Sequence, residues 1–153
     1  MTKTNNTKQD LYNQCLTFVD NRLKTVQNTI NEIQESLTSE TKSSAGDKHE
    51  TGRAMLQLER EKAGHQLAEI QKVNQLLSKM DISKSSEIVV LGSVVFTTQA
   101  NYFVAISAGQ MTSANDKFYA ISAITPIAQL LLGKTVGDTI QFRDQVFKII
   151  TLI

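Results

Sequence analysis

Two stretches with a seven-residue apolar repeat dominate the first half of this 153-residue chain. The first stretch contains two interleaved sets, Tyr12, Val19, Val26 and Ile33, and Leu16, Leu23, Ile30 and Leu37. A less regular second stretch contains Leu56, Ala63, Ile70 and Leu77, supported by Leu67, Val73 and Met80. Repeats of this kind are typical of helices that pack along an a/d seam. The pattern therefore predicts two long helices.

The short connection between the two stretches, residues 39–45, predicts that the helices fold back as an antiparallel coiled-coil hairpin over residues 1–81. Each arm, at about 30 residues and 1.5 Å per residue, would be about 45 Å long. Arg60 and Asn74 fall where the second seam should be apolar, and Gly64 costs about 1 kcal/mol relative to alanine inside a helix. We expect the hairpin to need the rest of the chain, or a partner, at its base.

From about Lys84 the pattern changes to short segments rich in Val, Ile, Phe and Thr, separated by turn residues. We expect strands over 87–98, 102–107, 118–124, 138–143 and 146–152. Between them, Thr125 and Pro126 have the order of a helix N-cap and first helical residue, and Gly133 follows as a helix stop. The chain is therefore predicted to be α+β, with a small antiparallel sheet domain and one short helix over 84–153.

Composition narrows the classes of function. The net charge of +1 does not favour tight binding to free nucleic acid, which needs a clear basic excess. No apolar run approaches the roughly 20 residues of a membrane span, and the polar N-terminus does not resemble a secretion signal, so a cytoplasmic protein without a membrane contact is expected. The lone cysteine, Cys15, falls on an apolar helical face and is predicted to be a buried, inert thiol.

The connection leads into an acidic segment, Gly46-Asp47-Lys48-His49-Glu50, which the hairpin would place at its tip. Asp47 and Glu50 have the spacing of a capping box, which needs no function beyond starting a helix. Asp47, His49 and Glu50 could instead form a metal site, although three groups so close in sequence converge poorly. A third interpretation is that the two carboxylates hold Mg²⁺ only together with ligands from a partner.

These residues resemble those of the bacterial Gre-type transcript cleavage factors, the GreA/GreB family. The tip is similar to their Gly-Asp-x-x-Glu-Asn motif. Residues 121–134, Ile-Ser-Ala-Ile-Thr-Pro-Ile-Ala-Gln-Leu-Leu-Leu-Gly-Lys, are similar to their Ile-Ser-x-x-Ser-Pro-Ile-Ala-x-x-Leu-Ile-Gly-Lys segment. Residues 89–93 also resemble their Val-x-Phe-Gly-Ser strand. The likeness covers nearly the whole chain in the right order.

The resemblance implies an FKBP-like C-terminal domain that docks on bacterial RNA polymerase, with Thr125 and Pro126 near the docking surface. It also implies that the hairpin enters the secondary channel of the polymerase. There Asp47 and Glu50 would act as the catalytic acids, helping to hold an Mg²⁺ that is shared with the polymerase and is not bound by the factor alone. The polymerase would then cleave backtracked RNA, so that this protein is a cofactor and not itself an enzyme.

Residues around the tip depart from the family pattern. Thr51 stands where the family has Asn, and Gly52-Arg53-Ala54 replaces Ala-Glu-Tyr. These changes favour, as an alternative, a non-cleaving regulator that binds the same channel. Lys42, Lys48 and Arg53 flank the acids and are candidates to contact the RNA 3′ end or the polymerase, or they are simply solvated charges.

A generic coiled-coil adaptor, in which the acids only cap a helix, is a further alternative. An independent enzyme is not expected, because the sequence has no nucleophile and base pair, no phosphate-binding glycine loop and no closed metal site. No small-molecule substrate is expected either.

Overall fold

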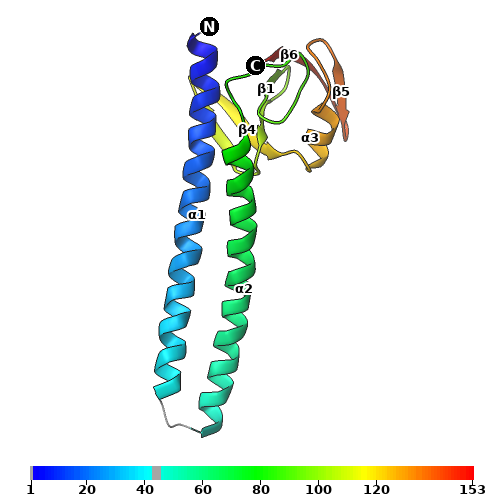
Figure 1. Ribbon diagram of the computed structural model, residues 1–153. Coiled ribbons are helices and arrows are strands. Elements are labelled where there is room, and N and C mark those ends of the chain that lie inside the picture. The colour runs from blue at the N-terminus through cyan, green and yellow to red at the C-terminus, as the bar shows by residue number, and fades with distance from the viewer. Residues whose placement is uncertain (1, 43–45) are drawn as a thin grey trace. The chain divides into compact units, whose positions relative to one another are not determined.

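The computed structural model describes the backbone of residues 2–42 and 46–153, and the side chains of residues 6–39 and 51–153. Two long helices, α1 (Thr2–Lys42) and α2 (Gly46–Lys79), run side by side and precede a sheet that carries the short helix α3 (Pro126–Leu131) (Figure 1). The strands are β1 (Val94–Thr97), β2 (Asn101–Ala105), β3 (Gly109–Ser113), β4 (Asp116–Ser122), β5 (Thr139–Phe142) and β6 (Gln145–Leu152). This architecture confirms the predicted α+β fold, a helical hairpin followed by a small sheet with one helix.

The sheet is mixed, with the strand order β3-β4-β2-β1-β6-β5. Four strand pairs are antiparallel, but β2 and β4 are parallel, with Tyr102 opposite Tyr119. The prediction of a wholly antiparallel sheet is therefore wrong at this pair. The reason is β3, which the sequence did not reveal. It forms a hairpin with β4 through Ala114 and Asn115, both at positive φ, and this extra strand reverses the direction in which the chain enters β4.

The chain packs as two units. The base unit contains residues 1–18 and 76–153, and the arm unit contains residues 19–75. The predicted domains, 1–81 and 84–153, follow the change from helix to sheet along the sequence. Packing groups the chain differently, because the first turns of α1 and the last turn of α2 belong with the sheet.

One face of the sheet packs under α3. Its buried cluster consists of Val89, Val95, Val104, Leu131, Ile140, Phe147 and Ile149. Successive side chains of a strand point to opposite faces, so the neighbours of these residues belong to the second face. That face includes Val94, Phe103, Phe118 and Ala120, all buried, and Phe96 meets Phe118 edge to face at 5.5 Å between ring centroids. The sheet is thus buried on both sides at β1 and β2, whereas Val146 and Ile150 of β6 are exposed.

The second face is covered from the start of the chain. Leu11 and Cys15 on α1 and Leu77 on α2 are fully buried, and Gln14 Nε2 donates a hydrogen bond of 2.9 Å to the Thr112 carbonyl of β3. Burying large apolar side chains contributes roughly 1.5–3 kcal/mol each. The base of α1 is therefore part of the core that stabilises the sheet.

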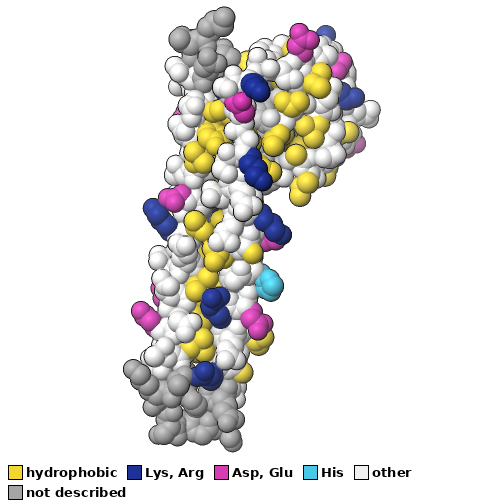
Figure 2. Space-filling model, in the orientation of Figure 1, with side chains coloured by type: hydrophobic (Ala, Val, Ile, Leu, Met, Phe, Trp, Pro, Cys, Tyr) yellow, Lys and Arg dark blue, Asp and Glu magenta, His cyan; other side chains and the backbone are white. Residues whose placement is uncertain are grey.

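In the arm unit, α1 and α2 pack along the predicted seam. Val19 and Ile33 from α1 and Ala63 and Ile70 from α2 are buried. The residues next in the seam are half-buried: Leu23, Val26, Ile30, Leu37, Leu56, Leu67 and Val73. On the face seen in Figure 2, apolar side chains lie between the two helices, and charged side chains lie along the flanks and, in places, over the apolar strip. The seam predicted from the heptads is confirmed in the arm unit, but Leu16, which the repeat also placed in the seam, is 37% exposed in the base unit.

Candidate functional site

The acidic segment lies in the first turns of α2, because this helix begins at Gly46. Asp47 and Glu50 are the candidate acids, and Lys48 lies between them. Their side chains, and that of Lys42 near the end of α1, lie outside the described residues, so the geometry of this part of the site stays a prediction. The same applies to the possible metal ligand His49.

Of the residues that flank the acids, Arg53 is the candidate contact whose side chain is described. It is half-buried on α2, one position after Gly52. Gly52 is therefore inside the helix, where glycine costs about 1 kcal/mol relative to alanine. We expect glycine at this position to weaken the start of α2 relative to alanine.

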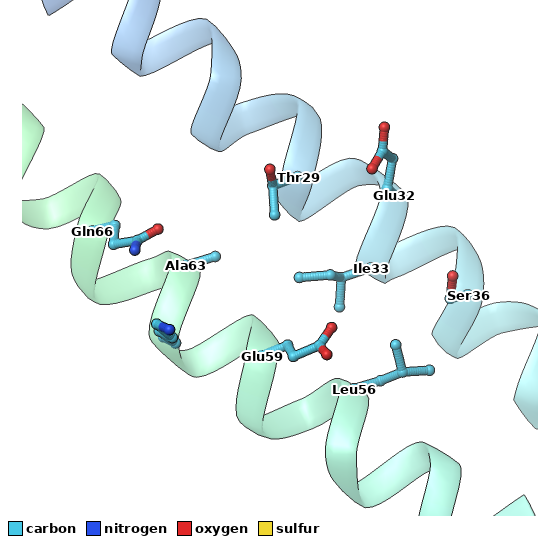
Figure 3. Close-up of a pocket in the computed structure, with 9 residues that line it drawn as sticks. Thr29, Glu32, Ile33, Ser36, Leu56, Glu59, Ala63 and Gln66 are labelled. Atoms are coloured by element: carbon cyan, nitrogen blue, oxygen red, sulfur yellow. The ribbon is translucent and has the colours of Figure 1, made fainter.

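The seam is incompletely filled around Ile33 and Ala63. A groove of about 490 Å³ lies there, lined by Thr29, Glu32, Ile33 and Ser36 of α1 and by Leu56, Glu59, Lys62, Ala63 and Gln66 of α2. Ile33, Leu56 and the carboxylate of Glu59 point into the space between the helices (Figure 3). The small side chain of Ala63, where a larger residue would fill a seam position, leaves this space open.

The two polar residues that interrupted the predicted seam are accommodated differently. Asn74 is exposed, whereas the neighbouring Val73 is half-buried. Arg60 is half-buried and lies along its own helix, with its guanidinium 3.3 Å from where a Cβ on Gly64 would be. The absence of a side chain at Gly64 thus leaves room for Arg60 to lie along the helix.

The predicted docking residues Thr125 and Pro126 lie at the start of α3. Thr125 is the N-cap, with its Oγ1 accepting a hydrogen bond from the Ala128 amide at 3.4 Å and donating one to the Ser122 carbonyl at 2.7 Å. Pro126 is the first residue of the helix and is exposed, and Gly133 follows its end at a φ of 83°. The predicted cap, proline and glycine stop are confirmed. Whether these residues dock on a partner remains a prediction.

The base of α1 carries polar residues that the sequence analysis did not single out for contacts with the rest of the base unit. Lys8 Nζ donates to the Lys84 carbonyl at 3.1 Å, and Tyr12 Oη donates to the Leu77 carbonyl at 2.6 Å. Lys8 is buried, which lowers its pKa, while nearby Asp81 acts in the opposite direction. The heptad pattern identified Tyr12 as a seam residue, and its polar hydroxyl is the one signal that could have suggested a hydrogen bond.

Cys15 is fully buried, as predicted, and burial raises the pKa of its thiol to about 12. A thiol that stays protonated at neutral pH is a poor nucleophile. Among the side chains the structure describes, no three His, Cys, Asp or Glu residues lie close enough together to hold a metal ion. No helix in the described ranges has the length and apolar content needed to cross a bilayer.

No protein-family model and no curated protein matches the chain. The chain is similar to solved structures, among them one described as the structure of the transcription factor Gfh1. That likeness covers 92% of this chain and 92% of the other, at 19% sequence identity and a TM-score of 0.34. Because both the identity and the TM-score are low, this similarity assigns the chain to no family and gives it no function.

Proposed function

We propose that this protein is a Gre-type transcription elongation factor. It would bind bacterial RNA polymerase through the secondary channel and stimulate cleavage of backtracked RNA by the active site of the polymerase. The proposal rests on three features that follow one another along the chain: the hairpin, its acidic residues and the sheet. A helical hairpin has Asp47 and Glu50 in the first turns of its second helix, and a sheet follows that carries a capped Thr125-Pro126 helix.

The donor chemistry of the tip suits a metal ion that is shared with a partner. Carboxylate oxygens are the ligands that Mg²⁺ prefers, and Mg²⁺ takes six ligands in an octahedral arrangement. Asp47 and Glu50 supply too few ligands to hold the ion alone, but enough to complete a shell that a partner begins. In a confined channel their negative charges act more strongly than in water. Their role would be to hold and orient, while the polymerase performs the chemistry.

The remaining candidate residues have supporting roles in this proposal. Lys42, Lys48 and Arg53 would contact the RNA 3′ end or the polymerase near the tip, and Thr125 and Pro126 would contact the polymerase surface. Pro126 is exposed, as such a contact requires. The protein would work in the cytoplasm as a cofactor of transcription.

The test is transcript cleavage by backtracked elongation complexes with Mg²⁺. We expect the protein to stimulate cleavage, and the double variant Asp47→Ala/Glu50→Ala to lose at least about tenfold of that stimulation, which corresponds to about 1.4 kcal/mol of barrier. The control is Asp20→Ala/Glu35→Ala, which removes the same charge from exposed positions on α1. Equal stimulation by the tip variant and the parent would refute the proposed role of the acids.

The alternative is a regulator that binds the channel without stimulating cleavage. Gly52 inside α2 and Thr51 beside the acids favour it, because both depart from the residues that position the acids in the family. Polymerase binding by the unsubstituted protein, with backtracked RNA left intact, would support this alternative. Failure to bind polymerase would favour the generic coiled-coil adaptor.

A further inference from the structure

Met55 and Leu58 are apolar residues on the outside of α2. They are 60% and 66% exposed, and in the described part of the arm unit no other large apolar side chain is comparably exposed. Their spacing of three residues places them on one face of the helix. The seam residues Leu56 and Ala63 face α1 instead, so packing of the hairpin does not account for this exposed pair.

Leu58 is also part of a shallow hollow of about 580 Å³ on the arm unit. Arg22 of α1 and Glu61, Lys62, His65 and Glu69 of α2 are among its other lining residues. Leu58 is the one large apolar side chain among the residues that line this hollow, and the polar side chains beside it form a rim like that of a protein interface. The rim carries both positive and negative side chains, so an anionic ligand such as a nucleic acid backbone is not favoured. The occupant should present an apolar group bordered by mixed charges.

A second copy of this chain would not bind stably through Met55 and Leu58 alone. Stable protein interfaces bury about 1,200–2,000 Å² in total, with roughly 20–30 residues on each side. Two exposed apolar side chains supply only a fraction of that area. The occupant must therefore be held mainly by other parts of this protein. A large partner that already receives the tip and the sheet domain meets this condition.

The position of Met55 and Leu58 along α2 indicates which partner would contact them. Leu58 follows Glu50 by eight residues on the same helix, about 12 Å along the axis at 1.5 Å per residue. A partner that encloses the tip acids would also lie beside Met55 and Leu58. We propose that these two residues pack against an apolar site on the wall of the polymerase channel and thereby set how far the hairpin enters. They would be positioning residues, and this inference depends on the proposed function.

The test compares the full-length protein with Met55→Gln/Leu58→Gln, which removes the apolar groups and keeps good helix formers at both positions. We expect its affinity for RNA polymerase to fall about tenfold, as loss of one or two small apolar contacts would cause. The matched control Met55→Leu/Leu58→Met should bind like the parent. The helicity and urea midpoint of all three proteins should be the same, because both positions are exposed.

A photo-crosslinking amino acid at position 58 provides a second measurement. We expect it to crosslink to polymerase, whereas the same group at Lys72, an exposed position about 21 Å farther along α2, should crosslink much less. Equal binding by the glutamine variant, or crosslinks at position 58 only to a second copy of this chain, would overturn this inference alone. If the parent protein does not bind polymerase at all, the proposed function and this inference both fail.

Discussion

At the scale of single residues, burial changes the chemistry of two ionisable groups at the base of α1. Lys8 and Cys15 are both buried, and burial disfavours the charged form of each. The effect lowers the pKa of the Lys8 ammonium and raises that of the Cys15 thiol. Because the two shifts have opposite directions, their contributions to the pH dependence of stability also have opposite signs.

The thiol of Cys15 has a pKa of about 12 in the folded chain, against an ordinary value of 9.0. Above pH 9 the unfolded chain releases this proton while the folded chain keeps it, so the free energy of unfolding decreases as the pH rises. The contribution is fully present below pH 9 and is lost progressively up to about pH 12, at about 1.4 kcal/mol per pH unit.

We predict that Cys15→Ala removes this alkaline loss. Between pH 8 and pH 10.5 its free energy of unfolding should fall by about 2 kcal/mol less than that of the parent, although the smaller side chain lowers its stability at neutral pH. Urea unfolding at each pH measures the difference. Lys8 is present in both proteins, so its opposite contribution cancels in the comparison. Parallel pH profiles for the two proteins would contradict the prediction.

At the scale of elements, two glycines have different structural roles. Gly64 lies inside α2, and Gly133 ends α3. Gly64 has an ordinary helical conformation, and a Cβ there would meet only the end of the flexible Arg60 side chain. Gly133, after the end of α3, has a φ of 83°, which residues with a Cβ rarely adopt. The same substitution should therefore have opposite effects at these two positions.

We predict that Gly64→Ala raises the free energy of unfolding by about 0.5–1 kcal/mol, because alanine is the better helix former and Arg60 can move aside. Gly133→Ala should lower it by about 1–2 kcal/mol, because alanine is strained at positive φ. Thermal unfolding followed by circular dichroism measures both changes. A loss of stability in Gly64→Ala would show that the position of Arg60 matters more than helix propensity.

Much of the structure at the scale of helices and strands was predictable from the sequence. The N-cap Thr125, the first-turn Pro126 and the stop at Gly133 act on groups within a few residues of themselves, so their local pattern was sufficient. β3 was not predictable in this way. Its residues, Gly-Gln-Met-Thr-Ser, have little of the β-branched and aromatic character of a strand. It forms because β4 offers a partner edge and the turn at Ala114 and Asn115 returns the chain.

At the scale of the whole molecule, the base unit is assembled from two separate parts of the chain. Phe103 and Phe118 lie on the sheet face opposite α3, and the base of α1 covers that face with Leu11 and Cys15. A sheet that begins at residue 84 lacks this cover. Its apolar face would then be exposed to water.

We predict that a fragment of residues 84–153 does not fold stably. It should bind a hydrophobic dye and lack a cooperative unfolding transition, because a core on one side of the sheet is left open. As a control, a chain in which residues 19–75 are replaced by a short Gly-Ser linker keeps the whole base unit and should unfold cooperatively. A cooperative transition in the 84–153 fragment would contradict the importance of α1 for the sheet.

The sequence by itself determined the two helices, their seam, the start and stop of α3, and the order of hairpin and sheet. These features depend on periodicity and on hydrogen bonds between near neighbours, and both are visible along the chain. Only the tertiary structure decided that β2 and β4 are parallel, that Lys8 is buried, and that the base of α1 belongs to the core of the sheet. Those outcomes depend on residues that are tens of positions apart, and their contacts exist only once both faces of the sheet are covered.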